Sequence, residues 1–376
     1  MVNDYKIEEL VSELIKFKTC QKNPEEIKRC LDFCKDFFSE EVVDGKVFIK
    51  EYKKNGVPSI VIANNPDKHL DVLLLGHIDT VDGPDELFEP KIVDGKLFGR
   101  GSMDMKAFVA TSMVVLKKVL NQDISNDLSI GVIIVSDEEL GGEYGAKYLV
   151  EEIGYSAKVV LVPDDGEKIN QVVSHSKSIM NVEFFAKGRE AHGCTPWEGE
   201  NAIEKNIITY KNLKKKFPDT DGLKGEQWIN TINLGILSGG TASNEVPGES
   251  RMVINIRWTD KTSKEDIINI INKSVVSGVN YKISFEAKGI ELDKENNFSK
   301  LYFDSIKTIT GKDVEFLKSG GGTDGRYFSY AGMNVITHQG SGGDCQGENE
   351  FVDIDSLYKL VDIQIDFFKK IAKNTL

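Results

Sequence analysis

The chain has 376 residues, of which 47 are Lys or Arg and 60 are Asp or Glu, so its formal net charge is −13. This acidity argues against nucleic acid and anionic membranes as partners, because both select a basic surface. Hydrophobic residues make up 40% and charged residues 28% of the chain, which are ordinary values for a globular protein. The length predicts more than one domain.

The N-terminal stretch 1–18 is charged throughout and lacks the apolar block of a signal peptide, and no apolar run of the chain is long enough to span a membrane. The stretch instead predicts an amphipathic helix whose apolar face carries Ile7, Leu10, Val11, Leu14 and Ile15. A second helix is expected to begin at Asn23-Pro24, with Asn23 as its N-cap and Pro24 at its first position. Cys30 and Cys34 are expected on its core face rather than in a metal site. Five cysteines, an odd number, indicate a reduced cytoplasmic protein.

Three near-continuous apolar runs, DVLLLG at 71–76, LSIGVIIVS at 128–136 and AKVVLVP at 157–163, predict strands that are buried on both faces. Such strands are typical of a parallel sheet. Helical patterns at 104–120 and 142–152 lie between them. Strands that alternate with helices predict an α/β domain.

From about residue 179 to 290 the pattern changes, because segments such as MNVEFFAKG and RMVINIRW alternate apolar and polar residues. This alternation is typical of antiparallel strands with one buried face, and helical patterns at 201–216 and 264–276 lie among them. We therefore expect a small α+β domain at 179–290, inserted into the sequence of a larger domain that is formed by 1–178 and 291–376.

After residue 290 the pattern of the first part returns. In chain order we expect a helix at 298–309, a Gly-rich loop at 320–325, a strand at 333–338 and a final helix at 355–373.

Acidic side chains and one histidine directly follow the three buried strands: His77 and Asp79, then Asp137, Glu138 and Glu139, then Asp164 and Asp165. Taken singly, each is ordinary for a loop or a helix start. Because the carboxyl ends of parallel strands meet at one edge of a sheet, the three together are expected to converge there, with Asp104 at a helix start. Carboxylates gather in this way around a cation, and imidazole with carboxylates suits zinc, cobalt or manganese.

Seven sequence blocks then follow a familiar order: GHIDTV at 76–81, GRGSMDMKA at 99–107, SDEELGG at 136–142, VPDDG at 162–166, AHGCTPWEGENAI at 191–203, GGTASNEVPGESRMVINIR at 239–257 and GGGTDGRYF at 320–328. With these blocks, over nearly its whole length, the chain resembles the co-catalytic zinc metallopeptidase and deacylase family of succinyl-diaminopimelate desuccinylase, acetylornithine deacetylase, glutamate carboxypeptidase and aminoacylase. The resemblance implies a phosphorylase/hydrolase-like α/β fold, in which helices flank the mixed sheet of a catalytic domain. It also implies that the insert is an α+β, ferredoxin-like lid and dimerisation domain.

The resemblance also implies a role for each residue of the metal centre. His77 and Asp164 are expected to bind one zinc ion, Asp104 to bridge two ions, and Glu139 to bind the second. Asp165 remains an alternative to Asp164 as the ligand.

Around these ligands, the resemblance implies that Glu138 is the general base, which takes a proton from the attacking water and can return it to the leaving amine. Asp79 would hydrogen-bond the far nitrogen of His77 and fix its tautomer. The resemblance further implies a cis peptide bond between Asp104 and Met105.

In the insert, the resemblance implies that His192, Asn244 and Arg257 reach an active site, and that His192 reaches the one of the partner subunit in a homodimer. His192 would donate to the oxyanion, and Arg257 would bind a substrate carboxylate, although Arg257 also fits an outward position on an amphipathic strand. The Gly-rich loop would help to bind the same carboxylate, through Gly321, Gly322, Thr323 and Arg326.

One position departs from the family pattern. The family has a metal-binding His four residues before a Glu near the end of the chain, and here Gln346 stands four residues before Glu350. Cys345, Asp344 or, less naturally, His338 are the candidates to replace that ligand, and the alternative is that the second site is degraded.

The sequence therefore predicts a metal-dependent hydrolase that cleaves an amide or peptide bond next to a free carboxylate, with an N-acyl amino acid or a small peptide as substrate. It is expected to hold one zinc ion tightly, with cobalt or manganese also possible, and the second site is uncertain. The alternative is a non-catalytic binding protein that has kept the fold.

Overall fold

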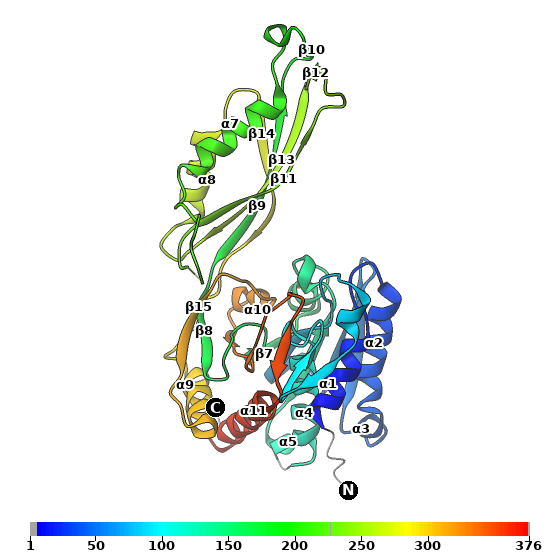
Figure 1. Cartoon of the computed structure of the whole chain (residues 1–376). Helices are drawn as coiled ribbons and strands as arrows, with labels where there is room; N and C mark the ends of the chain where they lie inside the picture. The colour runs from blue at the N-terminus through cyan, green and yellow to red at the C-terminus, as the bar shows by residue number, and fades with distance from the viewer. Residues whose placement is uncertain (1–5, 123, 226, 375–376) are drawn as a thin grey trace. The chain divides into compact units, whose positions relative to one another are not determined.

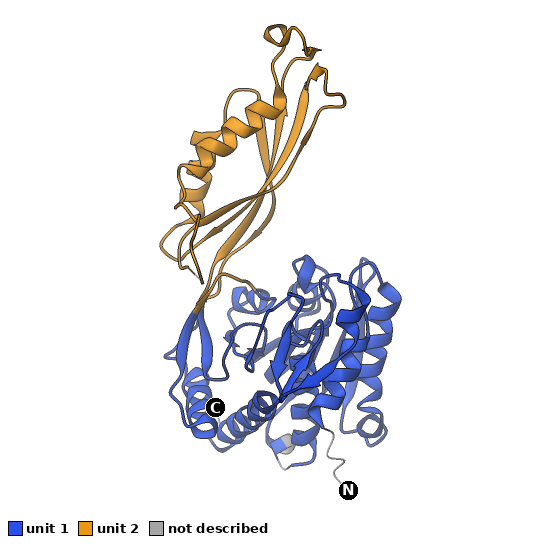
Figure 2. Cartoon of the chain, viewed as in Figure 1, with its two compact units in different colours: residues 1–174, 292–317, 323–376 blue, residues 175–291, 318–322 orange. Residues whose placement is uncertain are grey.

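The structure is a computed structural model that describes residues 6–122, 124–225 and 227–374 (Figure 1). The chain divides into two compact units, coloured separately in Figure 2. Unit 1 comprises residues 1–174, 292–317 and 323–376, and unit 2 comprises residues 175–291 and 318–322. The insert expected at 179–290 lies within unit 2.

Unit 1 is built on a six-stranded mixed sheet with the order β1-β2-β6-β3-β7-β16. The strands are β1 (Phe48–Lys54), β2 (Val57–Ala63), β3 (His69–His77), β6 (Ile130–Val135), β7 (Ser156–Val162) and β16 (Asn334–Thr337). Strands β6, β3, β7 and β16 run parallel, whereas β1 and β2 pair antiparallel at one side. The three buried parallel strands predicted from apolar runs are confirmed as β3, β6 and β7.

Hydrophobic cores cover both faces of this sheet. Val72 and Leu74 of β3 belong to one core cluster and Leu73 and Leu75 to the other, because successive side chains of a strand point to opposite faces. The first cluster is completed by α1 (Ile7–Lys16), α2 (Pro24–Asp36), α4 (Lys106–Leu120), α9 (Asn297–Thr310) and α11 (Ile354–Asn374). The second is completed by α6 (Ala146–Tyr148), the helical turn η3 (Leu149–Ile153) and α10 (Gly325–Tyr330).

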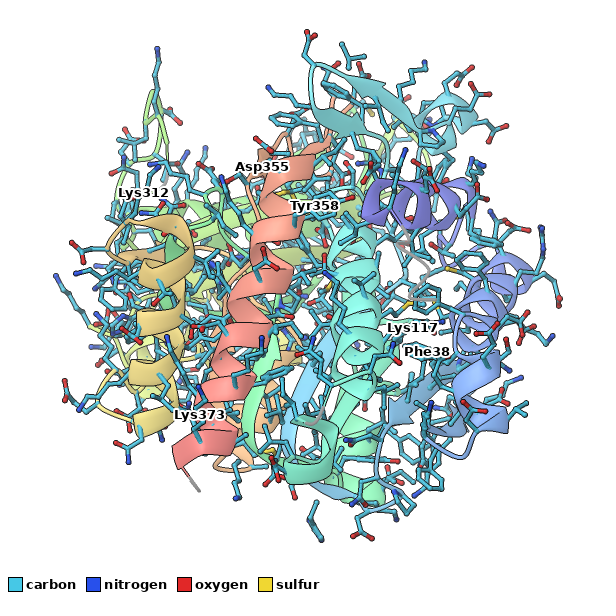
Figure 3. All side chains as sticks on the ribbon, turned by 90° about the horizontal axis from the view of Figure 1, so that it is seen from below. Phe38, Lys117, Lys312, Asp355, Tyr358 and Lys373 are labelled. Carbon is cyan, nitrogen blue, oxygen red and sulfur yellow. The ribbon has the colours of Figure 1, made fainter. Side chains whose placement is uncertain are left out.

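Helix α11 lies between α9 and α4 (Figure 3). Helix α4 contacts the end of α2 and α3 (Ser39–Val43) through Lys117. Lys117 of α4 lies beside Phe38 in this view. Its Nζ donates to the carbonyl oxygen of Phe37 at 2.9 Å and pairs with the Glu41 carboxylate at 3.1 Å. Both Cys30 and Cys34 are fully buried in the first core cluster, which confirms their predicted core position.

Two expectations about helix ends are corrected by the structure. The helix expected over 142–152 is formed only from Ala146 onward, because Gly141 and Gly142 have positive φ angles that a helix excludes. Asn23 precedes α2 as predicted, but its side chain donates to the carbonyl of Lys18 instead of capping the helix.

Unit 2 contains a four-stranded antiparallel sheet with two helices. In chain order the elements are β9 (Ser178–Lys187), α7 (Ala202–Lys214), β11 (Thr231–Gly239), β13 (Glu249–Trp258), α8 (Lys264–Ser274) and β14 (Val279–Ala287). The strand order β11-β13-β9-β14 with this βαββαβ succession is the ferredoxin-like arrangement that was expected.

Short strands complete both units. In unit 1, β18 (Phe351–Asp353) pairs with β5 (Lys96–Phe98), flanked by β17 (Gly342–Gly343) and β4 (Lys91–Val93). In unit 2, β10 (Ala191–His192) pairs with β12 (Glu245–Val246). Strands β8 (Gln171–Ser176) and β15 (Glu315–Ser319) contain two of the four boundaries between the units. None of the described helices combines the length and the apolarity that crossing a membrane requires.

Candidate metal centre

The carboxyl ends of three adjacent strands, β6, β3 and β7, define the site in unit 1. His77 is the last residue of β3, Glu138 and Glu139 follow β6, and Asp164 follows β7. Asp104 lies on the loop that enters α4. In an open α/β sheet this edge is the usual ligand-binding position.

A buried imidazole and two carboxylates meet there. His77 Nε2 lies 3.0 Å from Asp104 Oδ1 and 3.5 Å from Asp164 Oδ1. Ligand atoms of these three residues all lie within 4.8 Å of one another, and in the described part of the chain they are the group of His, Cys, Asp or Glu that can hold a metal ion. Asp164 is thus the member of the Asp-Asp pair that joins His77 and Asp104.

The charges of the three groups are strongly coupled. Burial opposes protonation of His77, but the carboxylates of Asp164 and Asp104 raise its pKa well above its usual value. Burial also raises the pKa of Asp164, to about 7, despite the charge of His77. Burial acts in the same direction on Asp104, but the hydrogen bond and charge of His77 lower its pKa to about 2. One imidazole and two carboxylates fit a divalent metal ion, which would take the place of the proton that they otherwise share.

Asp79 is fully buried and holds the neighbouring segment. Its two carboxylate oxygens accept hydrogen bonds from the backbone N–H groups of Glu138 at 3.3 Å and Glu139 at 3.1 Å. His77 Nδ1 lies 3.0 Å from the backbone oxygen of Asp79 and 3.4 Å from its carboxylate. The backbone carbonyl is therefore the nearer partner that orients His77, and the carboxylate chiefly fixes the turn of Glu138 and Glu139.

Glu138 and Glu139 are both half-buried at the edge of the site. Burial, together with the charges of Asp164 and Asp324, raises the pKa of Glu138 well above its usual value. Burial and the charge of Asp104 raise the pKa of Glu139 to about 7. A carboxyl group with a raised pKa is suited to exchange protons near neutral pH.

Gln346 occupies the side of Asp104 that faces Glu139. Its Nε2 lies 2.9 Å from Asp104 Oδ2 and 3.1 Å from each carboxylate oxygen of Glu139. Because ionised carboxylates only accept hydrogen bonds, the amide turns its N–H groups toward them. The arrangement partly offsets the two negative charges but supplies no strong ligand for a second cation.

The three residues considered as substitutes for the missing His lie differently. Cys345 Sγ is 3.4 Å from Asp104 Oδ2, and burial with the nearby Asp104 carboxylate raises the pKa of this thiol, which opposes thiolate formation. Asp344 accepts from the backbone N–H of Asn349 at 2.8 Å, within its own loop. His338 is buried with both ring nitrogens engaged, by the hydroxyl of Tyr302 at 2.9 Å and the carbonyl of Ile169 at 2.7 Å.

The sequence predicted no role for Glu350, which served only to locate Gln346. In the structure Glu350 holds the loop that carries Asp104. This buried carboxylate accepts from the backbone N–H groups of Gly101, Met103 and Asp104 at 2.9 to 3.1 Å, and from Arg100 Nη1 at 2.6 Å. The pairing of β18 with β5 brings the two segments together. The peptide bond between Asp104 and Met105 is cis, which confirms that expectation.

Three of the predicted substrate-site residues belong to unit 2. His192 and Asn244 lie at the β10–β12 pair, where the Gly193 N–H donates to the carbonyl of Asn244 at 2.7 Å and His192 Nδ1 accepts from the N–H of Cys194 at 3.1 Å. Arg257 Nη1 donates to the carbonyl of Gly320 at 2.5 Å, so the arginine adjoins the Gly-rich loop.

The other members of that loop divide between the units. Gly321 and Gly322 belong to unit 2, whereas Thr323 and Arg326 belong to unit 1 and are buried. Thr323 Oγ1 accepts from the N–H of Gly325 at 3.2 Å, at the start of α10. Arg326 Nη2 donates to the carbonyl of Gly141 at 3.0 Å and lies 3.4 Å from Asp324 Oδ1.

The sequence pattern of Peptidase family M20/M25/M40 matches residues 73–370, so the chain belongs to this family. The resemblance inferred from the seven blocks is thereby confirmed, and with it a metal-dependent hydrolase of amide bonds. The comparisons agree with the hydrolase and not with the non-catalytic binding protein.

Similar proteins support the same class. An uncharacterised metallohydrolase of Methanocaldococcus jannaschii is 28% identical over 85% of this chain and 87% of its own length. A succinyl-diaminopimelate desuccinylase of Colwellia psychrerythraea is 28% identical over 78% of this chain and 76% of its own.

Solved structures agree in fold. A tripeptidase from Staphylococcus aureus matches with a TM-score of 0.77 and 23% identity, covering 99% of this chain and 100% of its own. An M20 family metallo-carboxypeptidase from Sulfolobus solfataricus matches with a TM-score of 0.76 and 17% identity, covering 98% and 100%. The predicted α/β fold class is confirmed.

Proposed function

We propose that the protein is a zinc-dependent hydrolase that cleaves the C–N bond of an N-acyl amino acid or a small peptide next to a free carboxylate. The observation that carries this proposal is that ligand atoms of His77, Asp104 and Asp164 lie within 4.8 Å of one another, close enough to bind one metal ion. The names of the similar proteins, a desuccinylase and a tripeptidase, are consistent with substrates of this kind.

His77, Asp104 and Asp164 would hold the metal. A divalent ion bound by these residues would act as a Lewis acid and lower the pKa of water in the site toward about 7. One imidazole with two carboxylates favours zinc, and cobalt or manganese are accepted by the same ligand types. This position is expected to fill tightly.

A second ion would depend on Asp104, Glu139 and Gln346. A neutral amide is a weaker zinc ligand than imidazole, and the amide N–H groups of Gln346 face both carboxylates. We therefore expect one tightly bound ion per chain, with a second that is weakly bound or absent.

Glu138 acts as the general base. Its raised pKa suits it to take a proton from the attacking water and to return it to the leaving amine. Asp79 supports this role because its carboxylate holds the backbone N–H groups of Glu138 and Glu139.

The substrate carboxylate is assigned to Arg257 together with Gly321, Gly322 and Thr323. The support is the contact between Arg257 and the carbonyl of Gly320, which places the guanidinium at the Gly-rich loop. Asn244 is assigned to the same substrate.

His192 is assigned to the oxyanion in the active site of the partner subunit, which makes the functional protein a homodimer formed through the lid, residues 179–290. His192 is exposed, and it belongs to unit 2 rather than to the unit of the metal residues. We also propose a cytoplasmic location, because the five cysteines are all unpaired.

The experiment is a hydrolysis screen with zinc-loaded protein. The panel contains N-succinyl, N-acetyl and N-formyl amino acids, dipeptides and tripeptides, each with a matched C-terminal amide. We expect turnover of one class, loss of turnover with the C-terminal amide, and loss after dialysis against a chelator with recovery on adding zinc. Hydrolysis that resists chelation, or that ignores the C-terminal amide, contradicts the proposal.

A further inference from the structure

The start of helix α10 contacts the turn that carries Glu138 and Glu139. The carbonyl oxygen of Gly141 accepts two hydrogen bonds from this helix, one from Arg326 Nη2 at 3.0 Å and one from the hydroxyl of Tyr327. Arg326 is 6% exposed and Tyr327 is 8% exposed. Both side chains are therefore buried, and both hydrogen-bond the backbone of the turn.

Gly141 is directly coupled to the two glutamates. Its own N–H donates to the carbonyl of Glu138 at 2.7 Å, and the N–H of the next residue, Gly142, donates to the carbonyl of Asp137 at 2.8 Å. These bonds close the tight turn over residues 137–142. A group that fixes the Gly141 carbonyl therefore fixes the backbone from which both glutamate side chains project.

Asp324 adds a close packing contact at the same place. A Cβ atom on Gly142 would lie 1.9 Å from Asp324 Oδ1, and Gly142 has a φ of +65°. Only glycine fits there, so the turn lies directly against the carboxyl group that precedes α10. Asp324 in turn lies 3.4 Å from Arg326 Nη2, which keeps the guanidinium beside Gly141.

The opposite side of the turn is held by Asp79, whose carboxylate accepts from the N–H groups of Glu138 and Glu139. The turn is thus fixed at its start by Asp79, which follows β3, and at its end by the start of α10. Catalytic and ligand groups need this kind of support, because small displacements from the productive geometry reduce the rate strongly.

We propose that Arg326 and Tyr327 are positioning residues, which hold the turn of Glu138 and Glu139 through the Gly141 carbonyl instead of binding the substrate. The inference rests on the proposed function in one respect, the roles of Glu138 and Glu139. It replaces the expectation that Arg326 binds the substrate carboxylate.

The test uses Tyr327→Phe, which removes one donor to Gly141 and keeps the ring, and Arg326→Lys, which keeps the charge but changes the donor geometry. Tyr358→Phe is the matched control, because its hydroxyl also makes one hydrogen bond in unit 1, to Glu8 at 2.7 Å, away from the turn. Two quantities are measured for the 376-residue chain. The first is hydrogen–deuterium exchange of the amides of residues 138–142 without metal, and the second is kcat and KM for the best substrate of the screen.

For Tyr327→Phe we expect exchange at residues 138–142 to accelerate about 5- to 10-fold, kcat to fall by a similar factor and KM to stay within about 2-fold. Arg326→Lys is expected to behave in the same way, and Tyr358→Phe to match the wild type. Unchanged exchange overturns the proposal. A rise in KM at constant kcat also overturns it and returns Arg326 to substrate binding. If no substrate is found even for the wild type, the proposed function fails, while the exchange data still decide whether the turn is held by α10.

Discussion

Glu138 and Glu139 are neighbours in the sequence, but different groups surround them. The pKa of Glu138 is raised by burial and by the charges of Asp164 and Asp324. The pKa of Glu139 is raised by burial and by the charge of Asp104. Its carboxylate accepts a hydrogen bond from Gln346 Nε2 at 3.1 Å. These surroundings are consistent with the roles proposed for the two residues, proton transfer for Glu138 and the second ligand position for Glu139.

The first prediction separates these two roles. Glu138→Ala is expected to lower kcat by about 10²-fold or more, because the general base is lost. The tightly bound zinc is expected to stay in place, because Glu138 is not one of its ligands. Glu139→Ala is expected to weaken binding of the second ion instead. Zinc titration calorimetry, which measures both ions, and steady-state kinetics are carried out for the wild type and both variants. If the two variants show the opposite pattern, the assignment is wrong.

At the residue scale, the sequence predicted the groups whose position follows from strand ends. His77 and Asp164 directly follow apolar runs, so the sheet edge brings them together. Glu350 was missed as a support, because it acts by accepting backbone N–H bonds from Gly101 and Asp104, which lie almost 250 residues earlier in the chain. No local pattern reports such a contact, and only the pairing of β18 with β5 creates it.

At the element scale, α4 is joined to α3 by an ion pair and to the end of α2 by a hydrogen bond. Lys117 on α4 lies 3.1 Å from Glu41, which is 7% exposed, and also donates to the carbonyl of Phe37 (Figure 3). Removing the lysine would leave a buried carboxylate without this partner, which is costly.

The second prediction follows from this contact. Lys117→Met is expected to lower the free energy of unfolding by about 2 kcal/mol, because Glu41 loses its cationic partner inside the protein. Lys312→Met, at an exposed position after α9, is the control and is expected to change it by less than about 0.5 kcal/mol. Urea unfolding followed by circular dichroism measures both. Equal effects of the two substitutions would show that the Lys117 contact adds nothing.

Elements with a strong periodic pattern were predicted well. The apolar runs of β3, β6 and β7, and the alternating strands β9 and β13, all correspond to strands. Strand β1 escaped prediction because four of its seven residues are charged, in the sequence FIKEYKK, and its apolar pattern is weak. The start of the helix expected at 142–152 was predicted wrongly. Gly142 has a positive φ angle and packs against Asp324, which directly precedes α10 and is distant in the sequence.

At the scale of the whole molecule, the proposal joins two chains. His192 is expected to serve the active site of the partner, so the metal residues and the oxyanion donor of one active site would come from different subunits. The proposed homodimer is therefore part of the mechanism and has consequences for activity as well as for mass.

The third prediction tests this division. Sedimentation is expected to give twice the 41.9 kDa of one chain. Glu138→Ala and His192→Ala homodimers are each expected to be nearly inactive. Mixed dimers of the two variants should regain activity, because one site then combines an intact Glu138 with an intact His192. No recovery after verified subunit exchange would place His192 in the active site of its own chain, or outside catalysis.

The central claim concerns the metal: a hydrolase centre with one tight site and a second site weakened by Gln346. Calorimetric zinc titration of the metal-free wild type and of Gln346→His tests it most directly. We predict one tightly bound ion per wild-type chain with a second bound weakly or not at all, and in Gln346→His a second ion bound about 10-fold more tightly or better, because imidazole replaces an amide. Two equally tight ions in the wild type, or no tight ion at all, would contradict this account.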